Sequence, residues 1–319
     1  MTIILLIVGL ALIIFGANYL TEGAADMAKR MRVSDFVVGL TIVAMGTSMP
    51  EFVVSFMSAL QGKADVAVGN VVGSNLFNGL FILGVTALIL PLKYTRGNLK
   101  KDIPFGVLAS VVFFVVACDT LIDGASANVI SRTEGLLMLG FFIIFMIYTI
   151  YSAQGPRRTK RLKPPVVVKR PLWLSVVMVA GGLAALIFGG DLFLDNALAL
   201  ARNLGVSESV IAVTLLAGGT SLPELFASVV SAVKKKPGMA LGNIIGSNIF
   251  NIFFILGTSA AIFPLTTGEI IPADMLAVIV ASALLFVCAY TFKKATLDRT
   301  EGVIFILLYV AYIVWLLNR

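Results

Sequence analysis

Residues 46–51 read GTSMPE and lie inside an otherwise apolar run from Phe36 to Leu60. Glycine and proline both weaken a helix, and a carboxylate is costly in apolar surroundings. The same pattern returns as GTSLPE at residues 219–224, again within an apolar run. A costly hexapeptide that occurs twice indicates a function that both copies share.

The composition predicts a polytopic all-α membrane protein. Of the 319 residues, 59% are hydrophobic and 13% charged, and the mean hydropathy is +1.01. Such a chain cannot cover the surface of a soluble domain with polar groups. The first apolar run has no basic segment before it and continues toward Tyr19, so we expect a retained first span and not a signal peptide.

Other residue types narrow the function classes. The chain has no histidine, which removes imidazole chemistry and most zinc and haem sites. Cys118 and Cys288 lie in apolar runs without CxxC spacing and are expected to be inert core residues. The net charge of +7 comes from basic residues in the short gaps between apolar runs, so nucleic acid is not an expected partner.

The length and charge of the apolar runs predict ten transmembrane helices. About 20 residues are needed to cross roughly 30 Å of hydrocarbon. The stretches of suitable length are about 3–21, 36–60, 66–90, 103–119, 135–152, 172–201, 209–233, 240–264, 273–292 and 301–317. Of the 24 lysines and arginines, 20 fall in the gaps after odd-numbered spans. The positive-inside rule then places those gaps in the cytoplasm and both termini outside. We expect a multi-pass protein of a prokaryotic plasma (inner) membrane.

The two halves of the chain repeat each other. Shifted by 173 residues, Ala11–Leu92 aligns with Ala184–Leu265 without a gap, and 36 of the 82 positions are identical. This is an internal duplication, and because each copy holds five spans, the second enters the membrane from the opposite side. The sequence therefore predicts a first five-helix repeat at 1–153, a basic cytoplasmic linker at 154–171 and a second, inverted five-helix repeat at 172–319. The linker is a candidate for contact with anionic lipid, and Lys234–Lys236 is expected to be a solvated anchor.

The hexapeptides predict a cation site. Proline frees a backbone carbonyl, which is tolerated at membrane depth where it lines a cavity. Every donor atom is oxygen, as hard cations such as Ca²⁺ and Na⁺ prefer. No lysine or arginine lies near the middle of a predicted span, so no basic side chain is available to balance the buried carboxylates. A bound cation about 4 Å from a carboxylate would offset its cost by on the order of 4 kcal/mol at an effective dielectric near 20. We expect the inverted symmetry to bring the two carboxylates to the same depth. The candidate ligands in the hexapeptides are Glu51, Glu224, Thr47, Ser48, Thr220 and Ser221.

A second repeated motif adds neutral oxygens. GNVVGSNLFN at 69–78 matches GNIIGSNIFN at 242–251, and in each copy a serine and an asparagine four residues apart share a helical face. These are Ser74 with Asn78 and Ser247 with Asn251. The GxxxG glycines, Gly69, Gly73, Gly242 and Gly246, are expected to allow close helix packing. Asp191 and Asp195 match Asn18 and Glu22, and are candidates for an aqueous entrance.

With these two α-repeats, the chain resembles the sodium/calcium exchanger branch of the cation/Ca²⁺ exchanger superfamily over essentially its whole length. The resemblance implies ten helices, four cation sites at mid-membrane, three Na⁺ exchanged for one Ca²⁺, and alternating access. It implies that Glu51, Glu224 and the carbonyls of Thr47 and Thr220 bind Ca²⁺. Sodium sites would use Ala44, Ser48, Ser74, Ala217, Ser221 and Ser247, and Asn78 and Asn251 would complete the central site. Family members often carry Asp at one or both of these asparagine positions, so the two carboxylates here leave the stoichiometry open.

The expected function is that of a secondary active antiporter that exchanges Ca²⁺ for Na⁺, not an enzyme. No cofactor is expected; the expected partners are the transported Ca²⁺ and Na⁺, with H⁺ in one alternative, and membrane lipid, and a monomer should suffice. An H⁺-coupled Ca²⁺ exchanger is the first alternative and a cation channel the second. Inverted repeats with occluded carboxylates favour a carrier, because a channel needs a continuous wet path. The short linker leaves no room for a calcium-sensing domain between the halves.

Overall fold

The structure is a computed structural model that describes residues 2–153, 170–203, 217–268, 270–288, 290–291 and 295–318. Within these residues, six helices are long and apolar enough to cross a membrane. They are α1 (Thr2–Met31), the helix formed by α5, η2 and α6 (Ala64–Ile89), α9 (Arg132–Ala153), α11 (Leu172–Asn203), the helix formed by α15, η5 and α16 (Pro237–Ile262), and α18 (Arg299–Leu317).

Shorter helices occupy several other predicted spans. The pair Asp35–Thr47 and Met49–Leu60 passes the same test as one broken span, and Leu222–Val233 and Pro272–Val287 are shorter apolar helices. The predicted class, a helical polytopic membrane protein, is confirmed. The count of ten helices and the inversion of the repeats remain predictions.

The chain folds into two compact units, and each unit contains parts of both sequence repeats. The first consists of Met1–Thr47 and Ile143–Gly246, and the second of Ser48–Phe142 and Ser247–Arg319. The unit boundaries therefore do not follow the division into repeats at 1–153 and 172–319, which is a division of the sequence.

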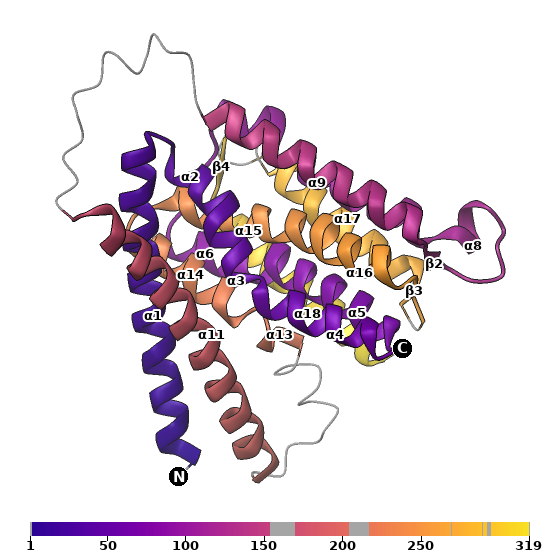
Figure 1. Cartoon of the computed structure of the whole chain (residues 1–319), viewed down its shortest axis with the longest axis horizontal. Helices are drawn as coiled ribbons and strands as arrows, with labels where there is room; N and C mark the ends of the chain where they lie inside the picture. Colours follow the sequence, from indigo (N-terminus) through magenta and orange to yellow (C-terminus); the bar gives the residue numbers. More distant parts are fainter. Residues whose placement is uncertain are drawn as a thin grey trace. The chain divides into compact units, whose positions relative to one another are not determined.

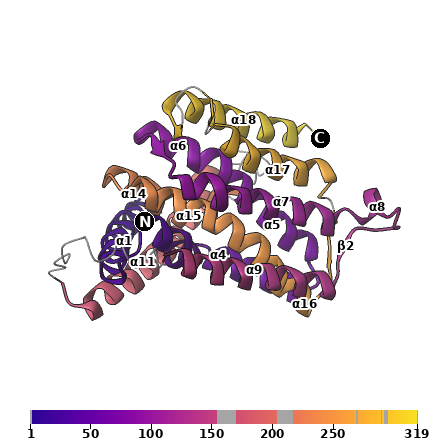
Figure 2. The same cartoon turned by 90° about the horizontal axis from the view of Figure 1, so that it is seen from above.

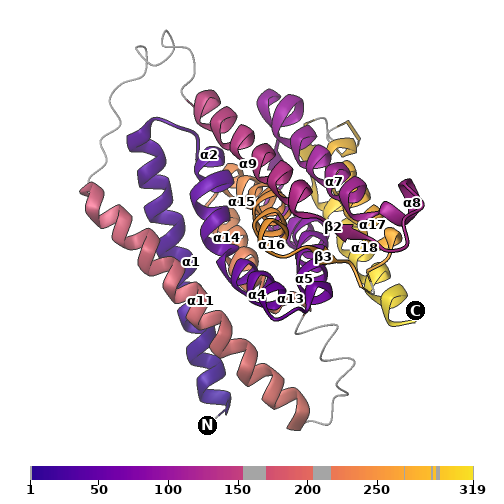
Figure 3. The same cartoon turned by 45° about the vertical axis from the view of Figure 1, so that its right-hand side comes forward.

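In the first unit, α11 runs beside α1 (Figures 1 and 3). α14 (Leu222–Val233) also packs against α1, and the short segments α2 (Asp35–Val38), η1 (Gly39–Val43) and α3 (Ala44–Thr47) follow α1 along the chain. The core is apolar and made largely of small side chains. It includes Ile13, Ala17, Leu20, Ala24, Leu186, Ala227 and Met239. Small side chains allow helix axes to approach closely, as is common in membrane helix pairs.

In the second unit, α18 packs against α6 (Leu83–Ile89), and α17 (Pro272–Val287) packs against α7 (Ile103–Ala117) (Figure 2). α4 (Met49–Leu60) packs against α5 (Ala64–Leu76). Phenylalanines fill much of this core: the Phe250 and Phe254 rings stack with centroids 4.7 Å apart.

The expectation of an all-α fold needs one small correction. β1 (Leu92–Lys93) pairs antiparallel with β4 (Thr296–Leu297), and β2 (Val129–Ile130) pairs antiparallel with β3 (Leu265–Thr266). Two-residue strands carry too little periodicity to be recognised in a sequence. They satisfy backbone groups in the connections between helices, where no helical hydrogen bonds are available.

The two hexapeptides interrupt their helices at equivalent serines. Ser48 precedes α4 with φ, ψ of −83°, 10°, and Ser221 precedes α14 with φ, ψ of −90°, 10°. A proline follows in the first turn of each helix, where a backbone N–H has no intrahelical partner. The expectation that the proline itself frees a carbonyl is therefore corrected: the helix break does so. The predicted helix breaks at Gly46–Pro50 and Gly219–Pro223 are confirmed.

Wide π-helical turns occur at equivalent places in the two repeats. η2 (Phe77–Ile82) begins one residue before Asn78, and η5 (Phe250–Leu256) begins one residue before Asn251. Such turns are rare and are frequently found at functional sites.

The predicted close packing of glycines is confirmed in one repeat. A Cβ on Gly242 would collide with the Phe36 carbonyl oxygen, and one on Gly246 would collide with the Leu40 carbonyl oxygen. Among the described residues, a Cβ on Gly69 would make only an ordinary contact with the Ile270 side chain, and a Cβ on Gly73 would meet nothing within 4 Å.

Candidate functional site

The two hexapeptide glutamates are fully buried at equivalent helix starts. Glu51 lies in the first turn of α4 and Glu224 in the first turn of α14, and each residue has 0% of its surface exposed. Asp and Glu are almost never fully buried unless another group balances the charge. The prolines fix where these helices begin, and so fix where the carboxylates lie.

In the second unit, Glu51 meets the GSNLFN motif of its own repeat. Ser74 Oγ donates to Glu51 Oε1 at 3.4 Å. Asn251, from the other repeat, donates through Nδ2 to Ser74 Oγ at 3.0 Å and to Asn75 Oδ1 at 3.1 Å. These predicted residues therefore form a connected group: Glu51, Ser74 and Asn251.

In the first unit, the polar group contains Thr47 and Glu224. Thr47 Oγ1 donates to Asn243 Oδ1 at 3.2 Å, and Asn243 Nδ2 donates to the Glu224 carbonyl oxygen at 3.4 Å. Thr47 and Ser221 are both 0% exposed. Thr47 and Glu224 belong to different repeats, so here too the two repeats contribute to one polar group.

The remaining predicted ligands are also largely buried. Ala44, Ser48, Asn78 and Ser247 have 0% exposure, Thr220 is half-buried, and Ala217 is described only by its backbone in α13 (Ala217–Gly219). Within the described residues, Asn78 Oδ1, Ser247 Oγ and Asn251 Oδ1 are buried atoms without a hydrogen-bond partner. Buried oxygens of this kind cost free energy unless something binds them, and a hard cation would do so.

Four further polar residues of this region are not among the predicted ligands. Asn70 Nδ2 lies 2.9 Å from Ser55 Oγ, and Asn243 Nδ2 lies 3.0 Å from Ser228 Oγ. A signal was available, because both asparagines and both serines are identical between the aligned repeats. Each asparagine also lies four residues before the predicted serine on its helix.

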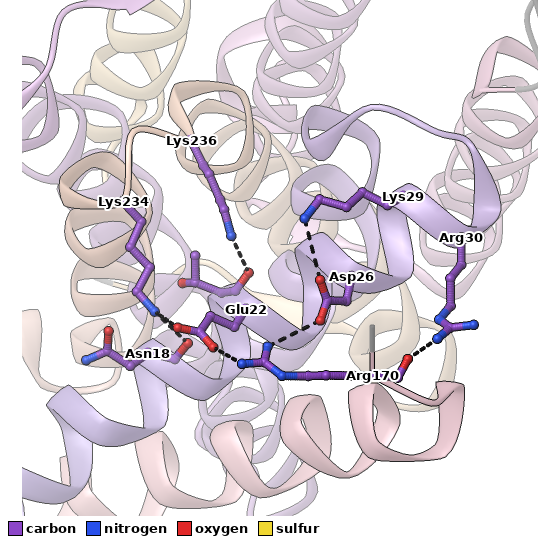
Figure 4. Close-up of polar contacts among 9 residues, drawn as sticks. Asn18, Glu22, Asp26, Lys29, Arg30, Arg170, Lys234 and Lys236 are labelled. Carbon is purple, nitrogen blue, oxygen red and sulfur yellow. Dashed lines mark hydrogen bonds and ion pairs between the residues drawn. The ribbon is translucent and has the colours of Figure 1, made fainter. Parts of the chain in front are cut away.

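A separate network of charges joins α1 to the start of α11 and the end of α14 (Figure 4). Glu22 accepts from Arg170 Nη2 at 2.9 Å and from Lys234 Nζ at 2.8 Å. Asp26 accepts from Arg170 Nη1 at 3.3 Å and lies 3.6 Å from Lys29 Nζ. The hydrogen bonds to Glu22 and then Asp26 raise the pKa of Arg170 above its ordinary value.

The same network corrects the expectation for the three lysines at 234–236. Lys234 Nζ also donates to the Asn18 carbonyl at 3.2 Å, and Lys236 Nζ donates to the Thr21 carbonyl at 3.2 Å (Figure 4). Burial lowers the pKa of Lys236. Lys234 and Lys236 are thus bound to α1, whereas Lys235 is exposed as expected.

Three other expected features are the aspartates of α11, the two cysteines and the basic linker. Asp191 and Asp195 are exposed on α11, and their assignment to an aqueous entrance remains a prediction. Cys118 and Cys288 are buried free thiols, as expected for core residues. The basic linker expected at 154–171 lies outside the described residues except for Arg170 and Pro171.

Long apolar helices, together with buried carboxylates that follow helix breaks, define a polytopic membrane protein of the ion-transporting class. The family model for the sodium/calcium exchanger protein matches residues 1–151 and 174–318. The chain therefore belongs to the sodium/calcium exchanger family, whose members are membrane antiporters and not enzymes.

Individual relatives agree with this family. The sodium/calcium exchanger MaX1 of Methanosarcina acetivorans is 32% identical over 340 residues, covering 98% of this chain and 97% of the relative. The inner membrane protein YrbG of Escherichia coli K12 is 34% identical over 279 residues, covering 84% of this chain and 81% of the relative. Among solved structures, the sodium-calcium exchanger NCX_Mj soaked with Na⁺ and Ca²⁺ matches with a TM-score of 0.82 at 30% identity, covering 98% of this chain and 97% of that one.

Proposed function

We propose that this protein is a secondary active antiporter that exchanges Ca²⁺ for Na⁺ by alternating access. Glu51 and Glu224 serve as the carboxylate ligands of the transported cation. The hydroxyl, carbonyl and amide oxygens of the two repeats complete the coordination, through Thr47, Ser48, Ser74, Asn78, Thr220, Ser221, Ser247, Asn251 and the main chain at Ala44 and Ala217.

One observation carries this proposal: two glutamates with 0% exposure begin equivalent helices directly after equivalent breaks. A carboxylate at the centre of a span costs about 2.5–3.5 kcal/mol on the mild insertion scale. A divalent cation offsets that cost for both glutamates together, and oxygen ligands of this type suit Ca²⁺ and Na⁺. The names of MaX1 and NCX_Mj support the same pair of ions.

Coupling follows from the number of carboxylates. Two glutamates balance one Ca²⁺ or a group of Na⁺ ions, but not both sets together without excess positive charge in a low-dielectric region. Competition for shared oxygens then couples the two fluxes. Without a bound cation the two carboxylates repel each other, which disfavours the change between the inward-open and the outward-open state.

Asn78 and Asn251 support one alternative, an H⁺-coupled exchanger. Asn78 and Asn251 are both neutral, so the charge at the proposed site comes from the two glutamates, and two protons would neutralise them as one Ca²⁺ does. An H⁺-coupled Ca²⁺ exchanger would use the same residues, with the glutamates carrying the protons.

The orientation and location are part of the proposal. The lysine and arginine distribution supports a cytoplasmic linker and external termini in a prokaryotic inner membrane. With an inward Na⁺ gradient, the protein would extrude Ca²⁺, and a monomer would suffice.

A flux experiment tests the proposal. Purified protein is reconstituted in liposomes that are loaded with Na⁺ or K⁺, and uptake of external ⁴⁵Ca²⁺ is followed at symmetric pH. We expect uptake from Na⁺-loaded liposomes, inhibition by external Na⁺ and by acid, and no uptake from K⁺-loaded liposomes. Uptake driven by a pH gradient without Na⁺ would establish the proton-coupled alternative. Uptake that is indifferent to the trapped cation would establish a channel and overturn the proposal.

A further inference from the structure

The side-chain amides of Asn70 and Asn243 make the same pair of contacts in the two repeats. Asn70 Nδ2 donates to Ser55 Oγ at 2.9 Å and to the Glu51 carbonyl oxygen at 3.3 Å. Asn243 Nδ2 donates to Ser228 Oγ at 3.0 Å and to the Glu224 carbonyl oxygen at 3.4 Å. The first set of contacts lies in one compact unit and the second set in the other. Two independent occurrences of one arrangement indicate that it has a role.

These contacts hold the main chain at the point where the helix begins. Glu51 and Glu224 each lie in the first helical turn after a break, where a helix opens most easily because its first amides have no intrahelical partners. A carbonyl oxygen has two lone pairs, so it accepts the asparagine amide in addition to its helical partner. The amide thereby joins that first turn to the neighbouring helix.

Asn243 has an additional contact that joins the two repeats. Its Oδ1 accepts a hydrogen bond from Thr47 Oγ1 at 3.2 Å, while its Nδ2 is bonded to the Glu224 carbonyl and to Ser228. Thr47 belongs to the first hexapeptide and Glu224 to the second. Asn243 is 1% exposed. Its side-chain amide offers both the donors and the acceptor that these contacts require.

We propose that Asn70 and Asn243 are positioning residues that set the affinity of the cation site. Each amide fixes the main chain of a glutamate, and Asn243 in addition ties Glu224 to Thr47, so that a displacement of one hexapeptide is passed to the other. This inference rests on the proposed function, because it concerns the same glutamates. The asparagines act through the residues that they hold and not as ligands.

A double-mutant cycle on Thr47 and Asn243 tests the link. Thr47→Val removes the hydroxyl but keeps the carbonyl, Asn243→Leu removes the amide, and the Ca²⁺ concentration for half-maximal uptake is measured at fixed internal Na⁺. We expect an increase of about threefold for the first and about tenfold for the second, as lost buried hydrogen bonds suggest. The double variant should resemble Asn243→Leu alone within about a factor of two, since Thr47→Val removes only a hydrogen bond that Asn243→Leu has already removed. Multiplicative effects, or single variants that match the wild type, would overturn the inference.

Two further variants separate positioning from simple loss of stability. Thr47→Ser keeps the hydroxyl and should need less Ca²⁺ for half-maximal uptake than Thr47→Val, and a Thr47→Ser protein that behaves like Thr47→Val counts against the link. Asn98 is another buried asparagine, bonded to Thr95 and Asp102. Asn98→Leu should lower the melting temperature without changing the Ca²⁺ requirement, and a tenfold change there would mean that destabilisation alone explains the results.

A readout without transport separates this inference from the proposed function. Hydrogen–deuterium exchange of the detergent-purified protein without Ca²⁺ should be about tenfold faster in Asn243→Leu, in peptides that contain Thr47 and in peptides that contain Glu224. Unchanged protection in both peptides refutes positioning even if Asn243→Leu folds poorly elsewhere. If the wild type fails to exchange Ca²⁺ for Na⁺ while protection changes as expected, the proposed function fails and the positioning role stands.

Discussion

The Asn251 amide donates to Ser74 Oγ across 3.0 Å, although the two residues are 177 positions apart in the chain. Ser74 Oγ in turn lies 3.4 Å from Glu51 Oε1. A neutral side chain of the second repeat is therefore connected, through one hydroxyl, to a carboxylate of the first. Asn251 influences Glu51 without carrying a charge of its own, which makes its replacement by a carboxylate informative.

Asn251→Asp should tighten Ca²⁺ binding at high pH and strengthen competition by protons. The variant adds negative charge to this group and removes the donor to Ser74, and crowded carboxylates hold protons more strongly. Ca²⁺ binding measured between about pH 6 and pH 9 should show a steeper pH dependence than the wild type. Asn318→Asp adds the same charge at an exposed position and should leave the profile unchanged. An unaltered affinity across this range for Asn251→Asp would remove Asn251 from the site.

Glu51→Gln and Glu224→Gln should each reduce Ca²⁺ exchange by at least about a hundredfold, since either variant leaves one charge to balance a divalent ion. The folded protein should remain, because glutamine has the same shape and the costly buried charge is lost. Uptake into Na⁺-loaded liposomes measures the first expectation, and size-exclusion chromatography with a melting curve measures the second. Asp123→Asn, at an exposed loop position, serves as the control. Wild-type rates in both glutamine variants would show that the cation binds elsewhere.

Thr159→Cys should be labelled from the cytoplasmic side and Ser126→Cys from the outside. The prediction follows from the distribution of lysine and arginine. The test uses a background in which Cys118 and Cys288 are replaced by alanine, and a thiol reagent that does not cross intact membranes. External labelling at Thr159 would contradict the inverted arrangement of the two repeats.

Glu22→Gln should lower the unfolding free energy by about 1 kcal/mol. Glu22 accepts from both Arg170 and Lys234, and its side chain is 39% exposed, so solvent screens part of the interaction. A melting curve in low salt should show a lower melting temperature for Glu22→Gln than for the wild type. High salt should reduce this difference in melting temperature. A variant that melts like the wild type in low salt would show that the network contributes nothing measurable to stability.

Much of the site could be predicted because duplication marks it. Glu51 and Glu224 were identifiable as a carboxylate repeated inside apolar runs, and the structure confirms that both are buried at helix breaks. Asn70 and Asn243 carry the same mark but were missed, because an asparagine in a helix has no distinctive chemistry until its partners are known. Their partners Ser55 and Ser228 are uncharged residues within apolar helices, and nothing in the local sequence distinguishes them from other serines.

Other features depend on tertiary structure that periodicity does not report. The wide turns at Asn78 and Asn251 have the same apolar pattern as an α-helix, so only the backbone geometry distinguishes them. Lys234 was expected to be solvated because it belongs to a run of lysines, yet α1 presents Glu22 to it. The composition of the two compact units likewise depends on which helices pack together, and a hydropathy pattern does not give that.

The interleaving of the two repeats within each unit has a consequence for biosynthesis. Asn251 follows Ser74 by 177 residues, so at roughly 5–20 residues per second it is made about 10–35 s later. During that interval Glu51 is in place before the amide that completes its surroundings exists. A nascent chain interrupted after residue 153 would hold a fragment of both units and the whole of neither. We expect membrane quality control to degrade such a chain, and pulse-labelling of a truncated gene product would show a short half-life in place of a stable half-sized transporter.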